Sequence, residues 1–316
     1  MSHKMKLLIL TAIALVCTAI FMFQGVEGNW GYVLPSRGKK ILAIVVTGGA
    51  IAFATIIFQT LTNNRILTPS IIGLDSLYML TQTLIIFLYG SDTLSITNKN
   101  VNFMLSVSIM MLFAILLYQF LFRGEGRNIY FLLLIGLVFG TFFGSISSFM
   151  QMLIDPNEFL IVQDRMFASF NNIQTDLLTI SMIGMGVTVL YFLRFAKYLD
   201  VLALGKEHAV NLGVSYNYVV KRLLLVVVVL ISISTALVGP ITFLGLLVAN
   251  VAHEFMKTFR HKPLITGSIL ISIIALVGGQ LIVERVFTFS TTLSVIVNFV
   301  GGVYFIYLLL KENKSW

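Results

Sequence analysis

Residues 223–238 read LLLVVVVLISISTALV, a nearly continuous apolar run without a charged side chain. A strand of a membrane β-barrel would alternate apolar and polar residues, because its two faces meet different surroundings. An α-helix instead satisfies its backbone hydrogen bonds internally and tolerates such a run in lipid. The stretch therefore predicts a membrane-spanning helix and decides the fold class of the chain.

The same composition extends over the rest of the sequence. Of its 316 residues, 58% are apolar and 11% are charged, whereas soluble domains carry about 25% charged residues. A span needs roughly 20 mostly apolar residues. We expect an all-α polytopic membrane protein in which about ten transmembrane helices form a single domain over residues 1–316. The predicted spans are Leu7–Phe23, Ile41–Leu61, Ile71–Tyr89, Phe103–Phe122, Ile129–Ile154, Ile173–Leu193, Leu223–Val238, Ile241–Met256, Leu264–Val283 and Leu293–Leu310.

Basic residues are distributed unevenly between the two sides of these spans. Cytoplasmic loops are enriched in Lys and Arg, so we expect both termini and the long polar loop 194–222 to be cytoplasmic. The same bias accounts for the net charge of +8 and argues against nucleic-acid binding. The residues counted inside are Lys4, Lys6, Arg65, Arg123, Arg127, Arg194, Lys197, Lys206, Lys221, Arg222, Lys257, Arg260, Lys262, Lys311 and Lys314; those outside are Arg37, Lys39, Lys40, Lys99, Arg165 and Arg285.

The loop 194–222 contains the most distinctive polar segment of the chain, Ala203–Val214. Gly205 and Gly213 bracket its central residues, and glycine readily adopts the left-handed conformation that ends a helix. We therefore expect a short helix between the two glycines, standing on the cytoplasmic side of the membrane.

Two interpretations of this short helix follow from its residues. Ala209, Val210 and Leu212 are available for an apolar contact, which favours a docking surface for a partner. Lys197 and Lys206 could instead face lipid phosphates, as in a connector that lies on the headgroups. The pattern alone leaves both interpretations open.

Small side chains line part of the fifth predicted span. Gly136, Gly140, Gly144 and Ser148 are spaced four apart, with Ser147 alongside, and residues four apart share one face of a helix. Such a face is typical of close helix packing in membranes. It is equally consistent with the smooth wall of a path wide enough for a bulky solute.

The sequence contains no recognisable catalytic, metal-binding or nucleotide-binding motif. His253-Glu254 lacks the second histidine of a zinc protease motif, and no Gly-x4-Gly-Lys-[Ser/Thr] nucleotide motif is present. Asp75 and Asp176 lie near predicted span ends, so neither favours a proton relay. Cys17 is the single cysteine. We expect no catalytic residue, metal site or cofactor in this chain.

Four segments of the chain resemble the FecCD-type permeases, the membrane subunits of ABC importers for iron–siderophores, haem and vitamin B12. They occur in the family's order and cover most of the chain. The four are Phe58-Gln59-x4-Asn64-x4-Pro69-x3-Gly73, Leu204-Gly205-Lys206-Glu207-His208-Ala209-Val210-Asn211-Leu212-Gly213, Gly239-Pro240-Ile-Thr-Phe243-Leu-Gly245-Leu246 and Val300-Gly301-Gly302-Val-Tyr-Phe305-x-Tyr-Leu308-Leu309.

Three places depart from the family pattern. The departures resemble a divergent branch that includes permeases for catecholate siderophores such as petrobactin. They are Ala249-Asn250 in place of Pro-His, Asn63-Asn64-Arg65 in place of Arg-Asn-Pro, and Gln280 in place of Asp.

The resemblance implies a permease like that of the type II, vitamin B12 importers. In that family the segment matching the loop docks into the ATPase subunit, and the fifth span lines the central cavity of a permease dimer. The path residues implied are thus the small ones of the fifth span named above. The ATPase-coupling residues implied are Leu204, Gly205, Glu207, Ala209, Leu212 and Gly213.

Basic residues on the predicted outer side run against the charge bias. They could reach outward to lipid phosphates. The family carries Arg-Leu-Pro-Arg at the first of these places, where it receives acidic residues of a substrate-binding protein. Arg37 and Lys40 match the two arginines in position, and Arg285 is a looser match. The resemblance therefore implies a docking site at Arg37, Lys40 and Arg285.

The resulting expectation is a permease in the bacterial cytoplasmic membrane that translocates a ferric siderophore. Its implied partners are a second permease, identical or homologous, two ATPase subunits that bind ATP and Mg, and an extracytoplasmic substrate-binding protein. The alternative is an ion-coupled secondary transporter of a bulky organic solute, which the shortage of mid-span carboxylates disfavours. A membrane enzyme would need a catalytic constellation that the sequence does not offer.

Overall fold

The computed structural model describes residues 2–25, 28, 30–90, 98–121, 129–171, 173–289 and 291–312, and none of these residues lies in a β-strand. A helix occupies each predicted span, so the all-α membrane fold is confirmed. The span helices are α1 (His3–Phe23), α2 (Trp30–Thr62), α3 (Leu74–Tyr89), α5 (Lys99–Leu121), α6 (Ile129–Leu153), α8 (Thr175–Phe192), α11 (Tyr216–Val238), α12 (Leu244–Met256), α13 (His261–Arg285) and α14 (Leu293–Glu312).

Short helices connect the spans. Four residues named in the sequence analysis lie outside the described part of the chain. They are Phe122, the predicted end of the fourth span, and the basic residues Arg123, Arg127 and Lys314. The connecting elements are η1 (Pro69–Ile72), α7 (Pro156–Met166), η2 (Ala196–Tyr198), α9 (Leu199–Leu202) and α10 (Lys206–Asn211).

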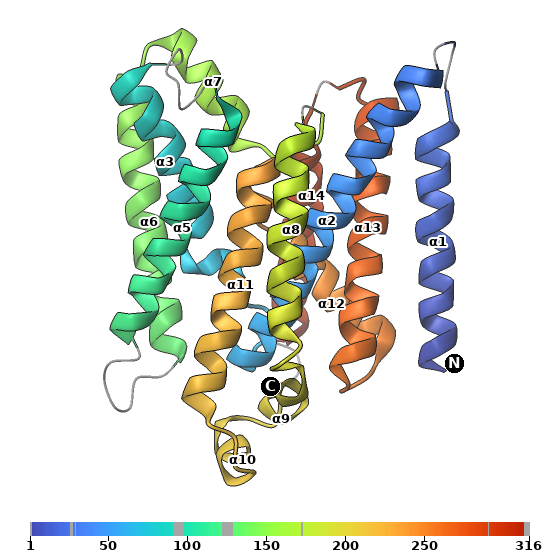
Figure 1. Ribbon diagram of the computed structural model, residues 1–316, viewed down its shortest axis with the longest axis vertical. Coiled ribbons are helices and arrows are strands. Elements are labelled where there is room, and N and C mark those ends of the chain that lie inside the picture. The colour runs from blue at the N-terminus through green and yellow to red at the C-terminus, as the bar shows by residue number, and fades with distance from the viewer. Residues whose placement is uncertain are drawn as a thin grey trace.

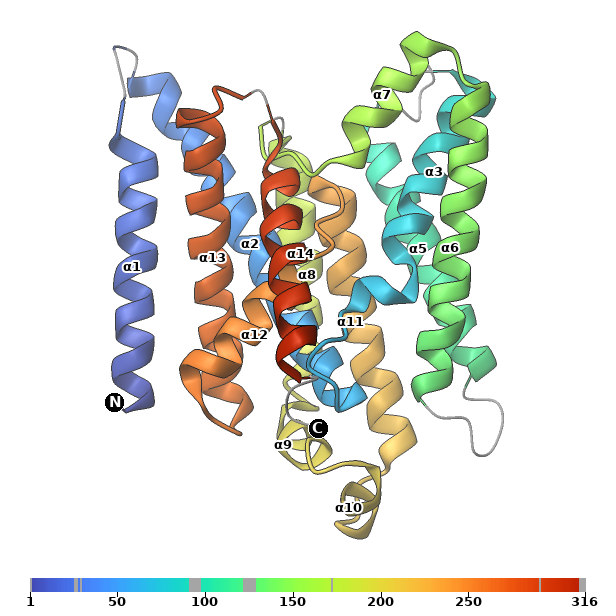
Figure 2. The ribbon, with the colours of Figure 1, turned by 180° about the vertical axis from the view of Figure 1, so that it is seen from behind.

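Among the described span helices, seven are long and apolar enough to cross a membrane, and three are shorter. The shortest, α12, has 13 residues, which gives about 20 Å at a rise of 1.5 Å per residue. The hydrocarbon core is roughly 30 Å thick. In Figure 2, α3 and α12 begin near mid-height of the molecule, whereas α1 and α13 extend over most of it. Two of the span helices therefore start inside the protein rather than at a membrane surface.

The core is built around α2, which is buried from Thr47 to Thr62 on all sides. It packs against α13 and α11 along much of its length. A Cβ atom added to Gly48 would lie 2.6 Å from the Leu276 Cδ1 atom of α13. Small residues are common where membrane helices approach closely, because packing rather than burial from water holds them together.

The two ends of the molecule differ in their connections. At one end α9 and α10 project beyond the span helices, on the same side as the start of α1 (Figure 1). At the opposite end α7 covers α3 (Figure 1), and the Ser169 amide donates to the Val238 carbonyl at 2.8 Å. The helix break predicted at Gly239-Pro240 is present, since Gly239 ends α11 with a φ of 99°.

Candidate functional site

The first candidate site is the projecting segment Ala203–Val214, here called the α10 segment. Gly205 precedes α10 with a φ of 95° and Gly213 follows it with a φ of 81°, a region that strongly favours glycine. The Val214 amide donates to the Ala209 carbonyl at 3.0 Å and closes the end of the helix. The short helix predicted between the two glycines is confirmed.

The α10 segment presents a small apolar surface at the tip of the molecule. The exposed fractions of Leu204, Val210 and Leu212 are 58%, 50% and 64%, and Glu207 beside them is exposed. Ala209, by contrast, is fully buried. The expectation that Ala209 offers an outward contact is wrong, because its side chain belongs to the buried apolar core.

A second group of polar side chains lies where α9 meets the span helices. His261 begins α13 and is 6% exposed; its Nδ1 atom pairs with the Asp200 carboxylate, and its backbone amide donates to the same carboxylate at 3.0 Å. On the other side of the ring, the Nε2 atom lies 2.8 Å from the Thr60 hydroxyl of α2. A single histidine thus joins α9, α13 and α2.

The electrostatic state of Asp200 follows from these contacts. Burial raises the pKa of its carboxyl group, but hydrogen bonds from the His261 side chain and backbone, with the charges of His261 and Arg260, outweigh this effect. The pKa of Asp200 is therefore held below its ordinary value. The carboxylate is the stable form at neutral pH and remains an acceptor for His261.

Beside this group lies a cavity of about 320 Å³. Two of the departures from the family pattern meet near it, since the Asn250 amide donates to the Arg65 carbonyl at 2.9 Å. Gln59 donates to the same carbonyl. The replacements at 63–65 and at 249–250 are therefore structurally linked. The cavity is lined by Gln59, Thr60, Asn63, Asn64, Arg65, Ala203, His253, Thr258, Phe259, His261 and Leu264.

The small residues of α6 do not form one continuous face. Gly136 and Gly140 pack against η1 and Gly73, with an added Cβ atom 2.8 Å from the Ile72 Cα in the first case. Gly144 has no neighbouring atom within 4 Å of such a Cβ. A helix has 3.6 residues per turn, so a spacing of four rotates the face by about 40° at each step. Gly136 and Gly140 thus pack within the protein, whereas Gly144 belongs to the open part of the row. A role in lining the translocation path remains a prediction for the open part.

The serines at the end of this row also diverge. Ser147 is 3% exposed, and its hydroxyl lies 2.9 Å from the Thr83 hydroxyl of α3. Ser148 is exposed. Ser147 thus belongs to the packing between α6 and α3, whereas Ser148 continues the open surface that begins at Gly144.

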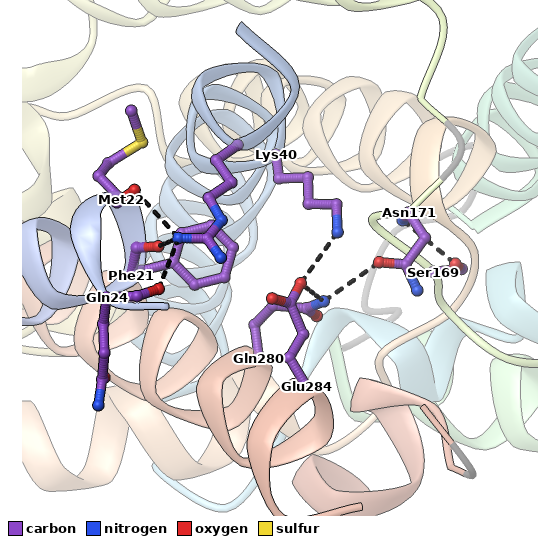
Figure 3. A network of polar contacts seen from close by, with 9 residues as sticks. Phe21, Met22, Gln24, Lys40, Ser169, Asn171, Gln280 and Glu284 are labelled. Atoms are coloured by element: carbon purple, nitrogen blue, oxygen red, sulfur yellow. Dashed lines mark hydrogen bonds and ion pairs between the residues drawn. The ribbon is translucent and has the colours of Figure 1, made fainter. Parts of the chain in front are cut away.

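The basic residues at the opposite end make internal contacts. Arg37 Nη1 donates to the carbonyls of Phe21, Met22 and Gln24 at 2.9–3.0 Å (Figure 3), and Arg285 also donates to the Gln24 carbonyl. These carbonyls end α1 and would otherwise lack partners. Docking at Arg37 and Arg285 remains a prediction; Arg285 is exposed and Arg37 is half-buried.

Lys40 belongs to a polar network at the same end (Figure 3). Its Nζ atom lies 2.9 Å from Glu284 Oε1, and the two side chains are 16% and 10% exposed. Gln280 Nε2 donates to Glu284 at 3.0 Å and to Asn171 at 3.2 Å. The residue that replaces the family's Asp, Gln280, therefore connects α13 to the loop before α8.

Metal ligands do not cluster in the part of the chain that the structure describes. No group of three or more His, Cys, Asp or Glu side chains is placed there to hold an ion. The arrangement thus offers apolar, small and hydrogen-bonding surfaces, which suit docking and passage.

Comparisons with known proteins agree with this geometry. The FecCD transport family matches residues 4–311 of the chain. The chain is 67% identical, over all of its 316 residues and all of the relative, to the petrobactin import system permease protein YclO of Bacillus subtilis (strain 168). It is 33% identical to the petrobactin import system permease protein FatC of Bacillus anthracis, over 89% of this chain and 79% of the relative. A solved inward-facing structure described as a metal-chelate type ABC transporter has a TM-score of 0.85 and 19% identity, covering 98% of this chain and 100% of its own.

Proposed function

The chain belongs to the FecCD transport family, and from this premise we propose that it imports ferric petrobactin as a permease subunit of an ABC importer. It is a multi-pass membrane protein and a permease rather than an enzyme, because ATP hydrolysis in such importers belongs to a separate ATPase. The observation that carries the substrate is its 67% identity to YclO, whose name states petrobactin import.

A second permease subunit and ATPase subunits complete the importer. Two ATPases dock on the α10 segments of the two permeases, and they hold ATP and Mg. The exposed side chains of Leu204, Val210 and Leu212 support this docking, because a small apolar surface at a projecting tip suits burial against a partner. An extracytoplasmic binding protein delivers the chelate to the opposite end.

The proposed orientation places both termini and the α10 segment in the cytoplasm. Support comes from the fold, in which α1 begins at the end of the molecule from which α10 projects (Figure 1). Most Lys and Arg residues are assigned to that side by the sequence, as expected for a cytoplasmic surface.

The siderophore itself supplies the ligands of the iron in this mechanism. The permease therefore needs a path with little side-chain bulk rather than a metal site. Gly144 and Ser148 offer such a surface on α6, since an added Cβ at Gly144 meets nothing within 4 Å and Ser148 is exposed.

Uptake in cells tests this function. A bacterial strain that lacks the chain is complemented with it, and the accumulation of radioactive iron is measured with ferric petrobactin and with a ferric hydroxamate. We expect restored uptake with petrobactin only, and none when the partner ATPase carries a substitution that blocks hydrolysis. Equal uptake of both chelates would contradict the substrate assignment, and uptake without hydrolysis would contradict the importer.

A further inference from the structure

The helices α2 and α13 have the most extensive contact of any two helices in the described part of the chain. They pack along their lengths, and at mid-length Gly48 admits both Leu276 and Ser272 of α13, which lie 2.6 and 2.7 Å from the position of an added Cβ. Interiors packed this tightly transmit displacement, because they deform very little. The two helices are therefore expected to move together.

Side-chain contacts fix the pair at the end next to the α10 segment. Thr60 lies near the end of α2 and His261 at the start of α13, and their side chains meet at 2.8 Å. His261 also binds Asp200 of α9 through its ring and its backbone amide. Buried Leu199 and Leu202 hold α9 against the span helices. The α10 segment is thus linked to two helices that are remote from it in the sequence.

A second set of contacts fixes the same pair at the opposite end (Figure 3). Lys40 of α2 pairs with Glu284 of α13 at 2.9 Å. Gln280 continues the network to the Asn171 side chain, and the Asn171 backbone amide donates to the Ser169 hydroxyl at 3.3 Å. These contacts join the α2–α13 pair to the loop that follows α7.

From this arrangement we infer that the α2–α13 pair transmits movement of the α10 segment to the opposite, outward end of the permease. Asp200, His261 and Thr60 are the positioning residues at the α10 end, and Lys40 with Glu284 fixes the outward end. This inference rests on the proposed function, because it takes the α10 segment as the ATPase dock. Coupling over such a distance is carried by packed helices and hydrogen-bond networks that have two arrangements.

The inference predicts which contact matters most. Chain continuity already joins the α10 segment to α8 and α11, so their response does not require His261. His261 adds a direct link from α9 to α2 and α13, because Asp200 and Thr60 contact opposite sides of one ring; α2 also packs against α11. Removing the Thr60 hydroxyl removes the side-chain link between α2 and His261, and the exposed docking surface of the α10 segment keeps its residues.

Spin-label distances in the complete importer test this transmission. Cys17 is replaced by serine, and labels are attached at Lys39→Cys on α2 and Asn157→Cys on α7, two exposed positions at the outward end. The label separation is measured without nucleotide and with ATP trapped on a hydrolysis-deficient ATPase. We expect a shift in the parent importer, a smaller shift in Thr60→Val, where the packing of α2 against α11 and α13 remains, and the full shift in Thr60→Ser, which keeps the hydroxyl.

A matched control separates this contact from a general effect of the substitution. Thr266→Val on α13 removes a hydroxyl that also bonds to the carbonyl four residues earlier, at 3.0 Å, but lies on the exposed surface. We expect Thr266→Val to shift like the parent importer. If Thr60→Val does not fold, Asp200→Ala serves instead, because its side chain is 60% exposed. An unchanged shift in the folded Thr60→Val or Asp200→Ala importer would overturn the inference.

Transport measurements distinguish this inference from the proposed function. In proteoliposomes, we expect chelate uptake per ATP hydrolysed to fall about tenfold in Thr60→Val, the scale of ordinary coupling between two sites. ATPase co-purification should remain normal. A parent importer without ATP-driven uptake would overturn the proposed function. Normal uptake in the parent with equal uptake per ATP in Thr60→Val would overturn the inference alone.

Discussion

Gly136 of α6 lies against the backbone of Ile72, so that a Cβ atom on the glycine would be 2.8 Å from the Ile72 Cα. Real Cβ contacts essentially never come this close, and the backbone of η1 cannot move aside as a flexible side chain could. We expect Gly136→Ala to lower the stability of the permease by about 1–3 kcal/mol, the usual cost of overpacking. Thermal unfolding of the purified protein in detergent measures this cost.

Gly144→Ala is the matched control on the same helix. An added Cβ there meets no atom within 4 Å, and alanine favours a helix over glycine by about 1 kcal/mol. We expect unchanged or slightly raised thermal stability. Equal destabilisation by Gly136→Ala and Gly144→Ala would contradict the division of the glycine row into a packed half and an open half.

Leu212 is the most exposed large apolar side chain of the α10 segment, at 64%. We expect Leu212→Glu to abolish co-purification of the ATPase, because a carboxylate would be buried at the apolar contact without a partner. Thermal stability of the permease alone should stay unchanged. Asn211→Ala, at the exposed neighbouring position, should retain the ATPase. Co-purification of the ATPase with Leu212→Glu would argue that the segment lies on lipid headgroups.

Ala209→Glu should behave differently from Leu212→Glu. Ala209 is fully buried in the segment, so its replacement by glutamate is expected to unfold the α10 segment and to lower the stability of the isolated permease. Limited proteolysis of the permease alone distinguishes the two variants, since cleavage within 203–214 should increase only for Ala209→Glu.

The sequence predicted the helices well and the contacts between them poorly. Hydropathy locates a span because lipid imposes the same demand on every residue of it. It carries no information on which helix lies next to which. Along the chain, His261 is 61 positions from Asp200 and 201 positions from Thr60. No sequence motif contains more than one of these three residues. Only the three-dimensional arrangement brings them together.

The same limit explains the two predictions about side chains that the structure altered. A four-residue spacing approximates one helix face over a single turn, but the accumulated rotation places Ser148 away from Gly136. Ala209 is as apolar as Val210 and Leu212, yet it alone of the three is buried, as part of the apolar core. In both cases local geometry, not residue type, decides what the side chain contacts.

The ion pair between Lys40 and Glu284 is largely shielded from solvent, with side chains 16% and 10% exposed. Replacing one partner leaves the other charge without compensation, which costs more than the pair itself contributes. We expect Lys40→Met and Glu284→Gln each to destabilise the permease, and the double variant to be less destabilised than the sum of the two. The interaction energy should be about 0.5–3 kcal/mol. A double-mutant cycle from thermal unfolding measures it, and strict additivity would contradict the ion pair.

The lowered pKa of Asp200 predicts how its contribution depends on pH. A carboxyl group with a depressed folded pKa stabilises the protein fully above its unfolded pKa, ordinarily about 3.9, and loses this effect as the pH falls through the folded value. Asp200→Asn keeps an oxygen acceptor for His261 but carries no charge. We expect the parent protein to be more stable than Asp200→Asn at about pH 5, which lies above the unfolded pKa of the carboxyl group. The difference should shrink below the ordinary carboxyl pKa, where Asp200 becomes protonated and resembles asparagine. Thermal unfolding of both proteins from about pH 5 down to below about pH 3.9 provides the measurement. A difference that has already disappeared at about pH 5, above the ordinary carboxyl pKa, would show that His261 and Arg260 do not hold Asp200 in its charged form.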